Sequence, residues 1–374
     1  MSLQALVLCS DEKIVRVLRR VLSDLEVAVQ HCRNAETAIG HLTRKRFEAV
    51  IVDCEDAQTA AEVLKSLRLA PGNKRAVAVA IIGGQTGLRA AFEMGAHFVL
   101  YKPVSMERAK VSFRAAHSLM KRERRRNLRI PIQIPVRFGK GQTAMTIDLS
   151  EGGLAVQVSR KSIQGDLRLS FAIPDSDAVI TADAQVAWES NTGQTGVRFV
   201  DLPSESRQQL KAWLNRNAPE AEKDDPPASC RLTDLSLGGC YLEINAPFPV
   251  QSRVVLSMRV ANLSVQVEGV VRVMHPEAGM GVEFTQRTPQ QRQQVEKFIE
   301  ALMHSQGVLP DLLVEPDGLE TESGNRVAVG EEAEDPLLEL FRNRAELPAE
   351  AFLGELRKQR RSQGSGSAET VLDM

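Results

Sequence analysis

The sequence is poor in several features that mark particular classes of protein. Aromatic residues make up only 4% of its 374 residues, so the cores must be built mainly from Val, Leu, Ile and Ala. The five cysteines form no Cys-x-x-Cys pair, and neither Cys nor His falls at zinc-ligand spacing. There is no apolar run of the roughly 18 residues that a membrane-spanning helix needs, and we expect no signal peptide because the first residues lack its basic start and long apolar run. These absences predict a soluble cytoplasmic protein without a metal site.

Length and charge narrow the class of protein further. A chain of 374 residues is too long for one small core and suits two or three domains. The formal net charge of −1 argues against a protein that coats nucleic acid along its whole length. No Ser-His-Asp or Cys-His constellation supports hydrolysis, so we expect a protein that is not an enzyme and needs no cofactor.

Residues 1–120 alternate short apolar runs with segments of helical periodicity. The run 49–52 has the character of a short buried strand, while residues 13–25 place apolar residues three and four positions apart. Five such strand–helix repeats predict a parallel sheet covered on both faces, a (βα)5 domain of the flavodoxin-like type. Sheets of this kind place ligands at the carboxyl ends of their strands. The expected strands are residues 5–8, 27–29, 49–52, 76–82 and 97–100.

From about residue 130 the pattern changes to short strands separated by Gly-rich turns. Strands this short and evenly spaced predict a small β-barrel or sandwich, followed by a helix over residues 203–217. The expected strands are residues 132–138, 143–149, 154–158, 166–173, 180–188 and 195–200.

The region 229–304 repeats this pattern. The segment Asp148-Leu-Ser-Glu-Gly-Gly aligns with Asp234-Leu-Ser-Leu-Gly-Gly at an offset of 86 residues. Gly196-Val-Arg-Phe aligns with Gly281-Val-Glu-Phe at an offset of 85. Two matches at nearly the same offset indicate a tandem duplication, whose copies we place at residues 121–217 and 229–304. A polar, Pro-containing linker over residues 218–228 separates them.

The last segment, residues 305–374, is acidic in its first half and ends in a Ser- and Gly-rich stretch. This composition predicts a mostly disordered tail. Pro336 and Pro348 each stand at the first turn of a short predicted helix. The apolar residues of these helices are Leu337, Leu338, Phe341, Phe352, Leu353 and Leu356. We expect an unattached tail, with a transiently docking helix as the alternative.

Two half-motifs lie at the start of the first copy. Arg125 and Arg129 form an Arg-x-x-x-Arg pair, and Asp148, Ser150 and Gly153 form an Asp-x-Ser-x-x-Gly turn downstream. In this order, and before a matching pattern of strands, they resemble the signature of the PilZ domain over residues 121–217. The resemblance implies a six-stranded barrel with a C-terminal helix, in which these five residues bind cyclic di-GMP.

These side chains suit cyclic di-GMP, which presents two phosphates and two flat guanines. A guanidinium forms paired hydrogen bonds with phosphate oxygens, stacks on aromatic faces and donates to the O6 and N7 edge of guanine. The opposite guanine edge carries N–H donors, for which Asp148 provides a carboxylate. Taken alone, the basic segment 121–129 would also attract nucleic acid or anionic lipid, and this stays an alternative. Because the Asp-x-Ser-x-x-Gly turn accompanies this basic segment, we do not expect the protein to bind nucleic acid.

The second copy keeps Asp234, Ser236 and Gly239 but lacks the arginine pair. Without the arginines it lacks its main phosphate and stacking contacts. No segment corresponds to the strand 132–138 either. We interpret this copy as a degenerate PilZ-like module used for packing, dimerisation or partner binding, with weak ligand binding as the minor alternative.

The N-terminal domain resembles the receiver domain of response regulators. Asp53 ends the third predicted strand, where receivers carry the phosphoacceptor, and Lys102 precedes a proline after the fifth strand, as in that family. The acidic pair expected after the first strand is Ser10-Asp11 here, and Gly83 replaces the expected Thr or Ser. Losing one carboxylate weakens a Mg²⁺ site. We therefore favour a pseudo-receiver that keeps Asp11 and Lys102, with a working phosphoswitch as the alternative.

Together these segments predict a signal-transduction effector with one α/β domain and two β-barrels. Cyclic di-GMP bound at the first barrel would reorient the domains and change contacts with a protein partner that the sequence does not identify. A homodimer is a further expectation. The alternative function is a phosphorylation-controlled response regulator that uses Asp53 and keeps the barrels as scaffold.

Overall fold

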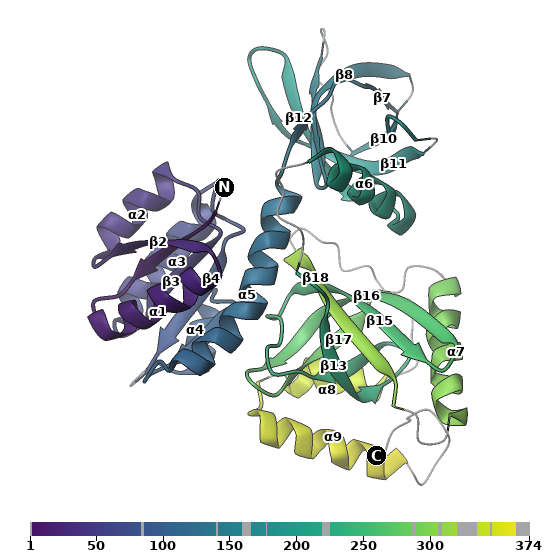
Figure 1. Ribbon diagram of the computed structural model, residues 1–374. Helices are drawn as coiled ribbons and strands as arrows, with labels where there is room; N and C mark the ends of the chain where they lie inside the picture. The colour runs from purple at the N-terminus through teal and green to yellow at the C-terminus, as the bar shows by residue number, and fades with distance from the viewer. Residues whose placement is uncertain are drawn as a thin grey trace. The chain divides into compact units, whose positions relative to one another are not determined.

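The computed structural model describes residues 2–83, 86–139, 141–158, 166–176, 178–218, 225–285, 289–305, 309–319, 335–344 and 346–363. The chain divides into two compact units. One consists of Met1–Glu123 together with Asp224–Met374, and the other is Arg124–Lys223. Figure 1 labels the helices and strands of both units.

The first part of the larger unit is a parallel sheet with helices on both faces (Figure 1). Its five strands lie in the order β2-β1-β3-β4-β5, and all neighbours are parallel. This confirms the predicted flavodoxin-like domain. Its elements are β1 (Leu3–Leu8), α1 (Glu12–Asp24), β2 (Val27–Cys32), α2 (Ala35–Arg44), β3 (Ala49–Asp53), α3 (Ala57–Leu69), β4 (Val77–Ile82), α4 (Leu88–Glu93), β5 (Phe98–Tyr101) and α5 (Met106–Arg126).

The central strands of this sheet are buried on both faces, which explains their continuous apolar runs. In β3, Ala49 and Ile51 pack with residues of α1 and α5. Val50 and Val52 pack on the opposite face with residues of α2 and α3. Because the strands are parallel, their carboxyl ends share one edge, and Asp53 stands at that edge.

The unit Arg124–Lys223 is a small barrel. Its strands lie in the order β6-β8-β7-β10-β11-β12-β9, and pairing of β8 with β9 closes the sheet. Leu210 and Trp213 of its helix pack into the core that the strands enclose. The helix and five of the predicted strands are confirmed within a few residues, whereas the strand predicted at 132–138 begins only at Pro135 and is preceded by the short strand β6. The elements are β6 (Ile130–Pro131), β7 (Pro135–Phe138), β8 (Gln142–Ser150), β9 (Gly153–Gln157), β10 (Asp166–Ala172), β11 (Val179–Glu189), β12 (Gln194–Asp201) and α6 (Ser204–Asn217).

The second barrel is closed, with its strands in the order β13-β14-β17-β16-β15-β18. Strands β13 to β17 match β8 to β12 in chain order and pairing. In the first barrel β7 lies between β8 and β10, and in the second β18 lies between β13 and β15, again antiparallel to both. The elements are β13 (Ala228–Leu235), β14 (Gly239–Glu243), β15 (Ser252–Val260), β16 (Leu263–His275), β17 (Gly279–Phe284), α7 (Pro289–His304) and β18 (Asp311–Leu319).

The second copy is therefore circularly permuted relative to the first. β18, which follows α7, takes the position that β7, which precedes β8 to β12, has in the first barrel. The boundary that we placed at residue 304 has to move to Leu319. Leu312 and Val314 are buried in the barrel core, as their alternation in β18 requires. β18 contains Pro316 and Gly318, which are uncommon in strand interiors.

The tail forms two helices, α8 (Pro336–Arg344) and α9 (Ala349–Gln363), which confirms the helices predicted at the two prolines. The expectation that this segment is unattached was wrong. Its apolar faces are buried against the second barrel because neither short helix can otherwise remove its leucines and phenylalanines from water. The disorder predicted for residues 320–334 and 364–374 lies outside the described residues. The cluster comprises Leu337, Leu338, Leu340, Phe341, Phe352 and Leu356 with Tyr241 and Val273.

Buried charged groups join the end of α5 to the second barrel within the larger unit. Arg122 is 1% exposed, and its Nη2 donates to Asp317 Oδ1 at 2.6 Å. Arg253 Nη2 donates to the other oxygen of Asp317 at 2.7 Å. Glu123 Oε1 accepts the N–H of Leu319 at 2.6 Å. Since a buried arginine is stable only when paired, β18 supplies the partners that let α5 pack here.

Across the part of the chain that the structure describes, no helix combines the length and apolarity needed to cross a membrane.

Candidate functional site

The β8–β9 connection of the first barrel forms a tight, glycine-rich turn. Ser150 Oγ donates to the Gly153 carbonyl at 2.8 Å, which holds the hydroxyl across the turn. A Cβ on Gly153 would lie 2.2 Å from the Val197 carbonyl oxygen of β12, so only glycine fits there. At Gly152, by contrast, nothing lies within 4 Å of a Cβ position. The turn is thus packed at Gly153 and open above Gly152.

The segment that precedes the barrel brings Arg129 to this turn. β6 pairs antiparallel with β8 and places Pro131 opposite Asp148. Arg129 Nη1 donates to Asp148 Oδ1 at 2.6 Å, and the two side chains are 43% and 23% exposed. Exposed ion pairs contribute little to stability, so a ligand can take over either partner at small cost. Four of the five predicted site residues therefore lie together at the β8–β9 turn.

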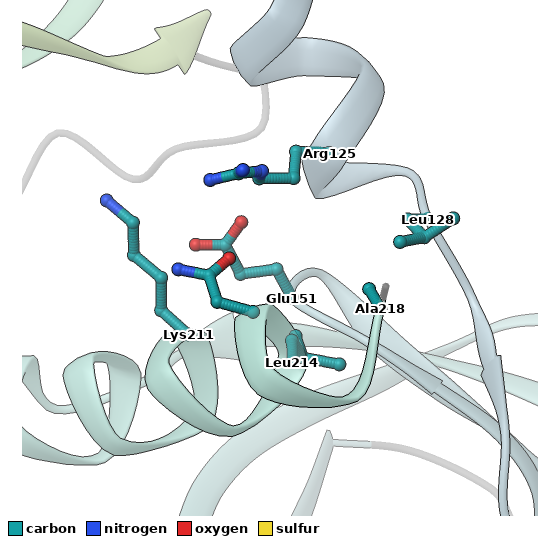
Figure 2. A pocket seen from close by; sticks show the side chains of 7 residues that line it. Arg125, Leu128, Glu151, Lys211, Leu214 and Ala218 are labelled. Carbon is teal, nitrogen blue, oxygen red and sulfur yellow. The ribbon is translucent and has the colours of Figure 1, made fainter. Parts of the chain in front are cut away.

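Arg125 lies on the last turn of α5 and faces the same turn at Glu151. Figure 2 shows its guanidinium and the Lys211 ammonium pointing toward the space around the Glu151 carboxylate. The depression here has a volume of about 270 Å³ with open solvent included. The lining residues are Arg125, Leu128, Glu151, Lys211, Leu214, Asn215 and Ala218.

Strand pairing places a further residue, Trp188, in the same row as Asp148. Asp148 pairs with Ala155, Ala155 with Gly196, and Gly196 with Trp188. Directly paired residues of antiparallel strands present their side chains on one face. Trp188 is 43% exposed, and a Cβ on Gly196 would meet its Nε1 at 2.1 Å, so the indole lies over this glycine. Two small residues thus separate a carboxylate from an exposed flat ring, an arrangement that suits a guanine.

The sequence analysis missed Trp188, Glu151 and Lys211. Glu151 lies inside the recognised turn and could have been found from its position. Trp188 and Lys211 come from β11 and α6, and only the register of the strands and the packing of the helix bring them to this site.

The carboxyl edge of the parallel sheet brings together Asp53 of β3 and Lys102, which follows β5. Lys102 Nζ lies 2.8 Å from Asp53 Oδ1 and 3.3 Å from Glu55 Oε2. The two residues that the receiver resemblance singled out as phosphoacceptor and lysine are therefore in direct contact.

Asp11, the third predicted residue of this edge, serves a different purpose. Its Oδ1 accepts the N–H groups of Lys13 and Ile14 at 2.7 and 3.4 Å, so it caps the N-terminus of α1. The side chain that contacts Asp53 here is Cys9, whose Sγ donates to Asp53 Oδ2 at 3.3 Å. Burial raises the pKa of the Cys9 thiol to about 12, so it stays protonated and provides no anionic ligand.

The neighbouring acids also have other partners. Glu12 forms an ion pair with Arg33, and Glu55 contacts Lys102. In the described ranges, no group of three or more His, Cys, Asp or Glu side chains is placed to hold a metal ion.

The fold consists of a flavodoxin-like α/β domain and two small β-barrels. The family model of the PilZ domain matches residues 121–216 and again residues 219–301. Two regions of the chain therefore match the PilZ domain, which confirms the resemblance recognised in the sequence and the tandem duplication.

Solved structures similar to this chain include receivers and a motility protein. The chemotaxis response regulator CheY4 of Vibrio cholerae is 18% identical, with 31% of this chain and 99% of that chain covered and a TM-score of 0.29. The receiver domain of the sensor histidine kinase PA1611 from Pseudomonas aeruginosa PAO1 is 18% identical, with 29% and 90% covered and a TM-score of 0.26. The Bacillus subtilis inhibitor of motility MotI/DgrA is 18% identical, with 25% and 51% covered and a TM-score of 0.23. No curated protein sequence is significantly similar to the chain.

Proposed function

We propose that this protein is an effector that binds cyclic di-GMP at its first barrel. The observation that carries the proposal is the contact of Arg129 with Asp148 at 2.6 Å. It joins residues 125–129, here called the arginine segment, to the Asp-x-Ser-x-x-Gly turn. Arg125 faces the same turn at Glu151, so two guanidinium groups meet it. A doubly anionic ligand with flat bases matches this set of donors, acceptors and exposed aromatic surface.

Binding would proceed by exchange of partners at the turn. Arg129 would leave Asp148 for a phosphate of the ligand, and the freed carboxylate would accept the N1–H and N2–H of a guanine. Arg125 would engage the second phosphate or the guanine O6 and N7 edge. Trp188 offers a ring for stacking at the other end of the Asp148 row.

The output of binding would be a change in the arginine segment. The segment follows α5 directly, and α5 is fixed through Arg122 and Glu123 to the second barrel. Ligand contacts with Arg125 and Arg129 would favour one arrangement of the segment over others and so shift the population of domain arrangements. We propose that this shift changes contacts with a protein partner or a second copy of the chain. The five free cysteines fit a cytoplasmic location.

Isothermal titration calorimetry with cyclic di-GMP tests the proposal. Arg125→Ala, Arg129→Ala and Asp148→Ala should each remove a charge-assisted hydrogen bond, at a cost of about 1.5–3 kcal/mol. Each variant should therefore bind roughly 10- to 150-fold more weakly than the wild type.

The matched control is Arg231→Ala, which removes the arginine that precedes the second turn in the sequence and should leave the affinity unchanged. Unaltered binding by all three site variants would contradict the proposal. Binding that depends strongly on salt and ignores Asp148→Ala would instead favour recognition of nucleic acid or anionic lipid by the basic segment.

A further inference from the structure

The second barrel has a face equivalent to the one that carries Asp148, Ala155, Gly196 and Trp188 in the first barrel. Asp234 pairs with Tyr241, Tyr241 with Gly281, and Gly281 with Val273. This row corresponds strand by strand to the row that runs from Asp148 to Trp188 in the first barrel. Tyr241 stands in place of Ala155, and Val273 stands in place of Trp188. The large aromatic residue of the row is therefore on β14 in the second barrel and on β11 in the first.

A carboxylate from the tail occupies the glycine turn on this face. Asp335 Oδ2 accepts from Ser236 Oγ at 2.9 Å and from the Gly238 N–H at 3.1 Å. Its other oxygen accepts the N–H groups of Leu337 and Leu338 at 3.0 and 3.4 Å, which caps α8. One carboxylate therefore links the second Asp-x-Ser-x-x-Gly turn to the first turn of a helix. The helix dipole adds to its stabilisation there.

The glycines of this face leave room for the tail helix. A Cβ on Gly238 would lie 2.6 Å from both Asp335 Oδ2 and Leu338 Cδ1, whereas nothing lies within 4 Å at the equivalent Gly152. A Cβ on Gly281 would meet the Phe341 ring at 2.7 Å. In the first barrel the equivalent glycine lies under the indole of Trp188, so Phe341 fills the space that Val273 leaves.

The second tail helix completes the contact. The ring centroid of Phe352 lies 5.4 Å from that of Tyr241 and 4.7 Å from that of His275, and Phe352 is fully buried. The Tyr241 hydroxyl lies 2.9 Å from His275 Nδ1, and His275 Nε2 lies 3.2 Å from the Leu347 carbonyl oxygen. The face thus combines one carboxylate site with an aromatic and aliphatic surface.

We propose that the second barrel is a peptide receptor: the face that carries Asp234, Tyr241, Gly281 and Val273 binds an amphipathic helix that begins with a carboxylate, and residues 335–363 are its ligand. Asp335 occupies the donors of the turn, and Phe341 and Phe352 cover the row that in the first barrel is open. The same atoms cannot receive cyclic di-GMP while the segment is bound. This inference does not depend on nucleotide binding by the first barrel.

A labelled synthetic peptide of residues 335–363 tests the inference in trans. The receptor is the full chain with Leu338→Asp and Phe341→Asp, which leaves the barrel unaltered and releases the attached segment. Fluorescence anisotropy should detect binding of the wild-type peptide to this variant. The wild-type chain should bind it at least tenfold more weakly, because the attached segment competes at high effective concentration.

Two peptide variants separate the proposed site from general apolar contact. A peptide with Asp335→Ala should bind at least tenfold more weakly. A peptide with Glu339→Ala, which loses the same charge from an exposed position of the same helix, should bind like the wild type. Absence of binding by the wild-type peptide, or equal binding by the Asp335→Ala peptide, would overturn the inference.

Hydrogen exchange in the full chain provides a second measurement that needs no released segment. Asp335→Ala should lower the protection of α8 amides while β13 to β17 keep theirs, and Glu339→Ala should leave both unchanged. Equal protection of α8 in the two variants would also overturn the inference.

Discussion

Two neighbouring glycines in the first turn have different surroundings. A Cβ on Gly153 would lie 2.2 Å from a backbone oxygen of β12, which cannot move without disturbing the sheet. A Cβ on Gly152 would point into open space, on the side where the ligand is proposed to lie. One glycine is required by the fold, and the other leaves the approach to the turn unobstructed.

Substitution by alanine should separate these roles. We expect Gly153→Ala to destabilise the first barrel by about 1–3 kcal/mol, the usual cost of overpacking. Gly152→Ala should change its stability by less than about 0.5 kcal/mol. Urea unfolding followed by tryptophan fluorescence reports this barrel specifically, because both tryptophans of the chain, Trp188 and Trp213, lie in it. Equal destabilisation by the two variants would contradict the close contact at Gly153.

At the scale of elements, the two barrels differ in what completes them. The strand that closes the first barrel, β7, precedes the other five strands of the ring in the sequence. The strand that closes the second barrel, β18, follows α7. In the second barrel no arginine segment precedes the turn, and Asp335 contacts the turn instead. Helices α8 and α9 then bury the face that the first barrel leaves open.

This docking should weaken in acid through His275. Burial lowers the pKa of its imidazole, and the hydrogen bond with Leu347 only partly opposes this. A depressed folded-state pKa means that the contribution of neutral His275 is complete above the unfolded pKa of about 6.5 and is lost as pH falls below it. Protection of α8 and α9 amides, corrected for intrinsic exchange, should therefore fall between pH 7.5 and 5.5. In His275→Gln it should not vary with pH, and an unchanged pH dependence would contradict this cause.

At the scale of the whole molecule, a regulatory signal could act at the receiver-like domain, at the first barrel or at both. The receiver-like edge keeps the Asp53–Lys102 contact but uses Asp11 as a helix cap and places a neutral thiol beside Asp53. Phosphorylation of a carboxylate needs Mg²⁺ held by neighbouring oxygen ligands. We therefore propose that this domain is a pseudo-receiver and that the nucleotide is the input.

Incubation of the full chain with acetyl phosphate and Mg²⁺ tests this proposal. We expect the wild type and Asp53→Asn to show the same absence of acid-stable, hydroxylamine-sensitive phosphorylation, measured by mass spectrometry and phosphate-affinity electrophoresis. Labelling of the wild type that Asp53→Asn abolishes would establish the alternative, a phosphorylation-controlled regulator.

The sequence by itself determined the parallel sheet, the first barrel, the duplication and the two half-motifs of the turn. These features depend on local periodicity and on residues close together along the chain, which short-range physical chemistry governs. The family resemblances singled out Arg129, Asp148, Asp53 and Lys102, and the structure then showed the contacts of Arg129 with Asp148 and of Lys102 with Asp53.

Only the tertiary structure decided the rest. β18 has a pattern unlike that of an interior strand, and it belongs to the barrel because the slot between β13 and β15 would otherwise leave backbone groups unpaired. Strand register places Trp188 in one row with Asp148, and Asp335 reaches the second turn across 99 residues of sequence. Such contacts join positions distant in the chain, and their free energy comes from packing and burial that no local segment encodes.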